Sequence, residues 1–190
     1  MEKERLISRL NFAMRKVEVI QLAESFIQLQ VKPDELIELA LQPSRVGFRA
    51  AWVLENVLLQ NMQALDYYLL EIAHRLPLVK TDSVKRHFAK ILAVGLNRIV
   101  SHKAAKVFIK AFWSANHESL QEFCFNGFID EKSKSALRVH CLEILYLLST
   151  REKWIAEELP AIIENQLAYC APSLRARGKD ILGKLSASKK

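Results

Sequence analysis

Residues 84–92 read Val84-Lys85-Arg86-His87-Phe88-Ala89-Lys90-Ile91-Leu92, and the same pattern occurs three more times in the chain. An apolar residue is followed at once by a basic one, and an apolar pair comes two helical turns later. The other copies begin at Phe48, Leu137 and Leu174, so successive copies are 36, 53 and 37 residues apart. Self-similarity at a period of this length indicates a repeat architecture.

Apolar residues recur at helical spacing along almost the whole chain. The clearest example is the set Val84, Phe88, Ile91, Leu92 and Gly95. Residues at these intervals lie on one face of an α-helix, and no long stretch alternates with the period of two that a β-strand requires. Glycine and proline number only five each. The sequence therefore predicts an all-α protein of about ten helices, whose short turns make consecutive helices antiparallel.

The repeated pattern resembles the first helix of the HEAT-like repeat, in the armadillo-type superhelix family. The consensus of that helix has Pro or Asp, then Val-Arg, small residues and Leu. Pro172-Ser173-Leu174-Arg175 and Asp82-Ser83-Val84-Lys85 match it best. The first copy departs from it, with Glu55 and Asn56 in place of the apolar pair. The resemblance covers about residues 17–186 and implies a right-handed α-α superhelix, a solenoid of antiparallel HEAT-like helix pairs.

The resemblance also implies an organisation for the whole chain. A single domain, 1–190, is expected, because one helix pair cannot bury its apolar face and neighbouring pairs must stack to form a core. The expected parts are an N-terminal capping helix at 1–16, helix pairs at 17–42, 44–79, 80–131 and 132–170, and a terminal half-repeat with a basic tail at 171–190. The helix that carries the repeated pattern, the motif helix, is expected to come first in each pair. The long middle spacing predicts an insertion near 117–134.

The net charge of +7 is concentrated in two segments. Residues 80–110 carry a net +7 and residues 171–190 a net +5, while the remainder is slightly acidic. Lys103, Lys106 and Lys110 fall at i, i+3 and i+7, on one face of the helix expected there. The candidate binding face consists of Arg86, Lys90, Arg98, Lys103, Lys106, Lys110 and Trp113. Such a face attracts phosphate backbones or an acidic partner, and the competing interpretation is a solvated helix face.

A second set of basic residues has a structural interpretation. Arg49, Lys85, Arg138 and Arg175 hold the equivalent position in the four copies of the pattern. In HEAT-like proteins, a basic residue at this position ties adjacent repeats together through an acid or a backbone carbonyl. The resemblance therefore implies that this structural ladder holds the stack together.

No motif in the sequence predicts a catalytic residue, a cofactor or a metal. The five histidines include no pair at i, i+4, and there is no HExxH, no GxSxG and no glycine-rich phosphate loop. Cys124, Cys141 and Cys170 have no CxxC spacing and are interpreted as reduced core residues of a cytoplasmic protein. No apolar run is long enough to cross a membrane. The aromatic segment 123–128 either plugs the solenoid or supports self-association as a homodimer.

These observations leave three functions. The first is a non-enzymatic binding scaffold for another protein, which rests on the repeat and on the lack of a catalytic motif. The alternative is a nucleic-acid-binding solenoid that uses the basic face at 80–110, because some DNA glycosylases for alkylated bases are built of HEAT-like repeats. No residue here matches their catalytic acid beside aromatics. The third is an enzyme with an unrecognised site, although paired acids such as Glu157 and Glu158 are interpreted as a solvated helix face.

Overall fold

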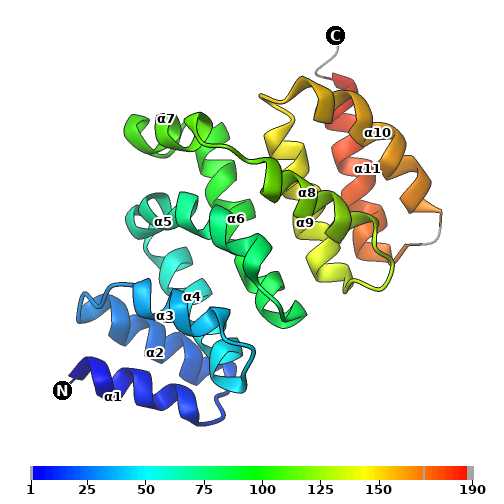
Figure 1. Cartoon of the computed structure of the whole chain (residues 1–190). Helices are drawn as coiled ribbons and strands as arrows, with labels where there is room; N and C mark the ends of the chain where they lie inside the picture. The colour runs from blue at the N-terminus through cyan, green and yellow to red at the C-terminus, as the bar shows by residue number, and fades with distance from the viewer. Residues whose placement is uncertain (1, 169, 188–190) are drawn as a thin grey trace.

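The computed structural model describes residues 2–168 and 170–187, and every regular element within these ranges is helical. Eleven α-helices and two short 3₁₀ helices follow one another from the N-terminus at the lower left to the C-terminus at the upper right (Figure 1). The prediction of an all-α protein is confirmed. Residues 188–190, which include the end of the predicted basic tail, lie outside the described residues.

The helices begin and end close to the breaks in the apolar period. Their bounds are α1 Glu2–Ser8, α2 Lys16–Gln28, α3 Asp34–Leu41, α4 Arg45–Gln60, α5 Met62–Arg75, α6 Asp82–Val100, α7 Lys106–Ser114, α8 Glu118–Ile129, α9 Ser135–Leu148, α10 Lys153–Leu167 and α11 Pro172–Ala187, with 3₁₀ helices η1 Arg9–Asn11 and η2 Leu76–Leu78. Ser44 caps α4, because its side chain accepts a bond from the Gly47 N–H at 3.0 Å. Asn61 caps α5 in the same way.

The four motif helices, α4, α6, α9 and α11, lie side by side. α4 packs on α6, α6 on α9 and α9 on α11, while α2 extends this row beyond α4. A second row consists of α3, α5, α8 and α10, each packed on the motif helix that follows it. The core fills the space between the rows, and its largest fully buried side chains are Phe26, Phe88, Phe112 and Phe128. The repeated pattern therefore marks one layer of a two-layer stack.

The helices pair in a different register from the expected one. Each of α4, α6 and α9 packs more extensively on the helix before it than on the helix after it. The pairs are α3–α4, α5–α6, α8–α9 and α10–α11. The motif helix thus closes a pair, whereas the sequence pattern predicted that it opens one. It follows that α11 belongs to a complete pair with α10, in place of the expected half-repeat.

Glycine occurs at the helix contacts of this register. A glycine stands at the contact within each pair, and the four are Gly47, Gly95, Gly127 and Gly178. A Cβ on Gly178 would lie 2.7 Å from Cδ2 of Leu167, and a Cβ on Gly95 would overlap Leu69. None of the described glycines has a positive φ, so they are needed for space and not for backbone conformation. They permit a close approach of the two helices within each pair.

α7 is the extra helix of the stack. It lies outside the four pairs and packs on α5 and α6, at the upper left in Figure 1. Residues 117–134, expected as an insertion, instead contain α8, the first helix of its pair. α6 ends in a turn with His102 at φ 55°, where the Lys103 N–H bonds to the Arg98 carbonyl at 2.9 Å. Lys103 therefore lies in this turn, and α7 begins only at Lys106.

Three residues of the structural ladder contact backbone carbonyls. The acceptors are Leu10 for Arg49 at 3.0 Å, Phe128 for Arg138 at 2.9 Å, and Ala168 and Cys170 for Arg175 at 3.5 Å. In each case the guanidinium joins its motif helix to a neighbouring segment. Lys85 differs, since its ammonium faces Asp82 of the same helix at 3.5 Å.

Candidate binding surface

The seven residues of the candidate binding face separate into two groups. Arg86, Lys90 and Arg98 lie on α6, and each has a side-chain partner within the stack. The other four, Lys103, Lys106, Lys110 and Trp113, lie on α7 or in the turn before it. The structure therefore does not gather the seven residues around one groove.

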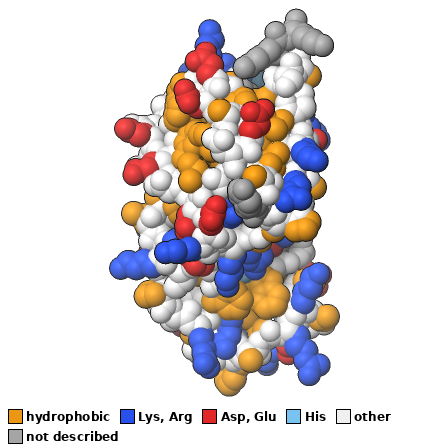
Figure 2. Space-filling view, turned by 90° about the vertical axis from the view of Figure 1, so that its right-hand side faces the viewer, with side chains coloured by type: hydrophobic (Ala, Val, Ile, Leu, Met, Phe, Trp, Pro, Cys, Tyr) orange, Lys and Arg blue, Asp and Glu red, His pale blue; other side chains and the backbone are white. Residues whose placement is uncertain are grey.

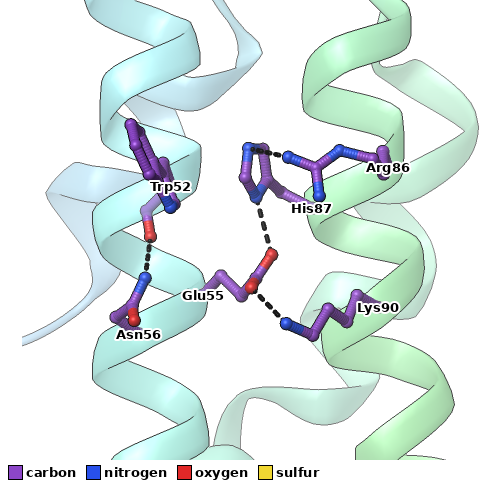
Figure 3. Close-up of polar contacts among 6 residues, drawn as sticks. All are labelled: Trp52, Glu55, Asn56, Arg86, His87 and Lys90. Carbon is purple, nitrogen blue, oxygen red and sulfur yellow. Dashed lines mark hydrogen bonds and ion pairs between the residues drawn. The ribbon is translucent and has the colours of Figure 1, made fainter. Parts of the chain in front are cut away.

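Glu55 of α4 is buried and lies between His87 and Lys90 of α6 (Figure 3). One carboxylate oxygen lies 2.6 Å from Nδ1 of His87, and the other accepts a bond from Nζ of Lys90 at 2.6 Å. Burial alone would raise the pKa of Glu55, but the hydrogen bonds from His87 and Lys90 outweigh it and hold the pKa below its ordinary value. Glu55 is therefore an ionised carboxylate, and α6 supplies the donor to each of its oxygens.

His87 is neutral in this cluster. Its Nε2 lies 2.9 Å from Nη2 of Arg86, which can only donate, so Nε2 accepts and the proton sits on Nδ1, facing Glu55. Burial lowers the pKa of His87 more than the bond to Glu55 raises it. The ring centre also lies 5.6 Å from that of Phe48 and 6.5 Å from that of Trp52. Polar and aromatic contacts together join α4 to α6.

Arg98 links α6 to α5. Its Nε and Nη2 donate to the two carboxylate oxygens of Asp66 at 2.7 and 2.8 Å, and Nη2 also reaches the Lys103 carbonyl at 3.2 Å. A two-point pair of this kind fixes the geometry of both side chains. Neither Glu55 nor Asp66 was predicted from the sequence as a partner of these cations. The sequence contained a sign of the role of Glu55, because Glu55 stands where the first copy of the pattern lacks its apolar pair. Asp66 stands at no such departure from the pattern.

A hollow of about 420 Å³ lies beside α7. Its lining residues are His102, Lys106, Ile109, Lys110, Trp113, Ser114 and Arg151. We refer to it as the basic hollow, because three of these residues are Lys or Arg and none is Asp or Glu. Arg151, in the turn between α9 and α10, places its guanidinium carbon 5.8 Å from the centre of the Trp113 ring. Two segments far apart in the sequence thus supply its cations.

Charge is also uneven on the face of the molecule that lies to the right in Figure 1. Figure 2 shows Lys and Arg side chains around hydrophobic ones in the lower part of this face, and Asp and Glu at its upper left. The view is turned about the vertical axis, so the lower part belongs to the N-terminal half of the stack. On this face, basic side chains therefore gather mainly in the lower part.

The two rows of helices and the repeated pattern both indicate a helical repeat. A family model of the HEAT repeat domain matches residues 6–185. The chain belongs to the HEAT repeat family. No curated protein and no solved structure matches this HEAT-repeat protein. HEAT repeats build helical scaffolds that commonly mediate protein interactions, and the family is typically non-enzymatic.

The described residues of the HEAT-repeat protein include no helix whose length and apolar character would let it cross a bilayer. The same residues contain no group of three or more His, Cys, Asp or Glu placed to hold a metal ion. Cys124, Cys141 and Cys170 are buried free thiols. Burial, and then the contact with Cys141, raise the pKa of Cys124 well above its ordinary value. This thiol is therefore protonated and unreactive at neutral pH.

Proposed function

We propose that the HEAT-repeat protein is a non-enzymatic scaffold that binds another protein through the surface around the basic hollow. One observation carries the proposal: Lys106, Lys110 and Arg151 share the hollow with no acid in its lining. Within the stack, by contrast, Lys90 is paired with Glu55. An acidic group on a partner would supply the counter-charge that the lining of the hollow does not provide.

α7 also offers apolar groups to a partner. Val107 is 66% exposed, and so is Tyr67 of α5, whose ring meets Phe108 edge-on with centres 6.2 Å apart. Trp113 and Arg151 belong to the residue types that contribute most to protein interfaces. Exposed apolar side chains beside cations support a protein-binding surface over a merely solvated helix face.

The contacts of Glu55 support a non-enzymatic role. This carboxylate lies on the row of motif helices close to an aromatic cluster, where an acid could take part in chemistry. Its two oxygens are already engaged by His87 and Lys90 in holding α4 to α6. We also propose a cytoplasmic location, which the three buried free thiols support because such thiols are typical of a reducing compartment.

Site-specific crosslinking in cells that produce the protein tests the proposal. A photoreactive amino acid in place of Val107 should crosslink a partner protein. The same group in place of Phe12, which is 64% exposed but lies after η1 and far from α7, should not. The double variant Lys106→Glu with Lys110→Glu should abolish the crosslink at position 107, because it places negative charge where an acidic group is expected to bind.

The matched control is Lys32→Glu with Lys80→Glu, which makes the same change in net charge at exposed lysines outside the basic hollow. Crosslinking that is equal at positions 107 and 12, or that persists in the Lys106/Lys110 variant, contradicts the proposal. A crosslinked product of two copies of this chain would show that the partner is a second copy and that the protein forms a homodimer.

Nucleic-acid binding is the competing function, and the cations of the basic hollow also favour it. A gel-shift assay with a short DNA duplex at low salt separates the two functions. If the wild type binds the duplex, the Lys106/Lys110 variant does not, and the Lys32/Lys80 control does, nucleic acid replaces protein as the partner. A wild type that binds no duplex at low salt removes this alternative.

A further inference from the structure

A second hollow, of about 540 Å³, lies between the start of α8 and the start of α10. Its lining residues are Ala115, Asn116, His117, Glu118, Gln121, Glu122, Phe125, Glu152 and Trp154. We refer to it as the acidic hollow, because three of these residues are Glu and none is Lys or Arg. The rings of Phe125 and Trp154 stack with centres 5.4 Å apart, and Trp154 is 46% exposed. Carboxylates thus stand beside an accessible aromatic pair.

His117 adds an unpaired acceptor to the lining of the acidic hollow. It is 93% buried, at 7% relative exposure, and its Nε2 lies 2.7 Å from the Phe112 carbonyl, so Nε2 carries the proton and donates it. Nδ1 is then an acceptor, and it has no partner among the described residues. Burial lowers the pKa of His117, which keeps the ring neutral. A ligand that carries positive charge suits the three carboxylates, and the neutral His117 ring places no positive charge against it.

The acidic hollow and the basic hollow adjoin one another. Arg151 lines the basic hollow, and Glu152, the next residue, lines the acidic one. Where α7 leads to α8, the ring of Trp113, which lines the basic hollow, meets the ring of His117, which lines the acidic hollow. The two rings meet edge-on, with centres 6.5 Å apart. The aromatic pair of Trp113 and His117 and the turn at residues 151–152 therefore form one wall with opposite charge on its two sides.

We propose that the two hollows form one bipartite site for a partner protein segment that carries an acidic side chain and, a few residues away, a lysine or arginine. The inference rests on the proposed function and adds the chemistry of the partner. The acidic side chain enters the basic hollow beside Lys106 and Lys110. The basic side chain enters the acidic hollow, where Glu118 and Glu122 supply counter-charge and the exposed face of Trp154 supplies a cation–π contact.

Opposite charge on the two sides of the wall sets the direction in which a segment binds. A segment in the reverse orientation would bring its acid to the carboxylates and its base to the lysines. The same arrangement disfavours nucleic acid, because a phosphate backbone that crosses the wall from the basic hollow meets Glu118, Glu122 and Glu152. Both features favour a peptide segment of mixed charge over a polyanion.

Selection from a random library of short peptides displayed on phage, against the full chain, tests the inference. Enriched peptides should carry both an acidic and a basic residue at a constant spacing. Their synthetic forms should bind the wild type, with affinity measured by fluorescence anisotropy. Lys106→Gln with Lys110→Gln, and separately Glu118→Gln with Glu122→Gln, should each weaken binding about five- to tenfold.

Matched controls change equal charge elsewhere on the surface. Lys32→Gln with Lys80→Gln, and Glu24→Gln with Glu131→Gln, replace exposed residues outside both hollows and should leave affinity unchanged. A peptide in which the acidic residue is replaced by lysine should bind poorly to the wild type. That peptide should recover affinity with the Lys106→Glu/Lys110→Glu variant, which a merely structural role for the lysines would not produce.

Several outcomes overturn the inference. Enriched peptides that are acidic only, a Glu118/Glu122 variant that binds them equally well or more tightly, or a library that yields no specific peptide would each do so. These outcomes leave the proposed function standing if position 107 still crosslinks a partner protein in a manner that depends on Lys106 and Lys110. If duplex DNA binds, and binds more tightly once Glu118 and Glu122 are neutralised, both the inference and the protein-binding proposal fail together.

Discussion

α6 and α7 are consecutive helices within one cationic stretch, but their basic side chains differ in what they contact. On α6, Lys90 is paired with Glu55 and Arg98 with Asp66. On α7, Lys106 and Lys110 are exposed beside a hollow that no acid lines. The difference arises because α6 closes a helix pair and has motif helices on both sides, whereas α7 lies outside the pairs. A run of positive charge in a repeat protein indicates binding only where the neighbouring helices do not neutralise it.

Three ion pairs that cross the stack share a spacing in the sequence. Lys90 follows Glu55 by 35 residues, Arg98 follows Asp66 by 32, and Arg177 follows Glu143 by 34. Each acid thus precedes its base by about one repeat, which places the two on adjacent helices. Acids one repeat earlier therefore neutralise Lys90 and Arg98 on α6. Four measurements test the contacts that hold the stack together and the contrast between α6 and α7.

Glu55→Ala should have the largest effect. It removes the buried carboxylate that holds His87 and Lys90, so the free energy of unfolding should fall by about 2–3 kcal/mol, measured by urea denaturation. The control Glu24→Ala, at an exposed acid of α2, should change it by no more than about 0.5 kcal/mol. Equal losses in the two variants would show that α4 and α6 are not held by this cluster.

Gly95→Ala should have the next largest effect. The added Cβ overlaps the side chain of Leu69, which is buried and must shift within a packed core, at a cost of about 1–3 kcal/mol. Gly183→Ala is the matched control, because no atom lies within 4 Å of the added Cβ and alanine favours the helix by about 0.5–1 kcal/mol. Thermal or urea unfolding should therefore give opposite signs, and a stabilising Gly95→Ala would contradict the role of glycine in pairing.

The glycine contacts also show where sequence analysis reaches its limit. Periodicity was sufficient to predict an all-α stack, and the basic residue after Val84 or Leu137 identified motif helices that the structure places in one row. The pairing register could not be predicted in this way, because a pattern within one helix does not show which neighbouring helix packs on it. Gly95 indicates a close contact in the sequence but does not name Leu69 as its partner.

The candidate site was predicted in part, for a similar reason. Lys106, Lys110 and Trp113 share a helix, so their spacing alone placed them together. Arg151 joins them from a turn between α9 and α10, and only the packing of that turn beside α7 reveals it. The sequence assigned Lys90 to the same face, because the residues around Lys90 do not reveal its partner. That partner, Glu55, lies a full repeat earlier in the sequence. Local patterns find what one helix presents, and tertiary packing decides what remains exposed.

The change of stability with pH should be smaller than the effects of Glu55→Ala and Gly95→Ala. It should arise from buried histidines within the stack. Burial lowers the pKa of His87 and His140, on motif helices, and of His117, before α8, below the ordinary value of 6.5. The unfolded chain therefore binds more protons as pH falls through 6.5, and the free energy of unfolding should decline from about pH 7.5 to pH 5.5. His140→Gln should reduce this slope in urea midpoints, while His102→Gln, at an exposed residue before α7, should not. Equal slopes in all three proteins would refute the assignment.

Neutralising single lysines should have the smallest effect and gives the most direct comparison of α6 with α7. Lys90→Gln loses the bond to Glu55 and should lower the urea midpoint. Lys110→Gln removes like charge beside Lys106 and Arg151, so the midpoint should stay unchanged or rise. Equal destabilisation by the two variants would mean that Lys110 also stabilises the fold. This result would contradict the proposal that the basic hollow binds a partner. A midpoint that rises with Lys110→Gln would show that this charge opposes folding, as expected of a residue whose contribution lies in binding.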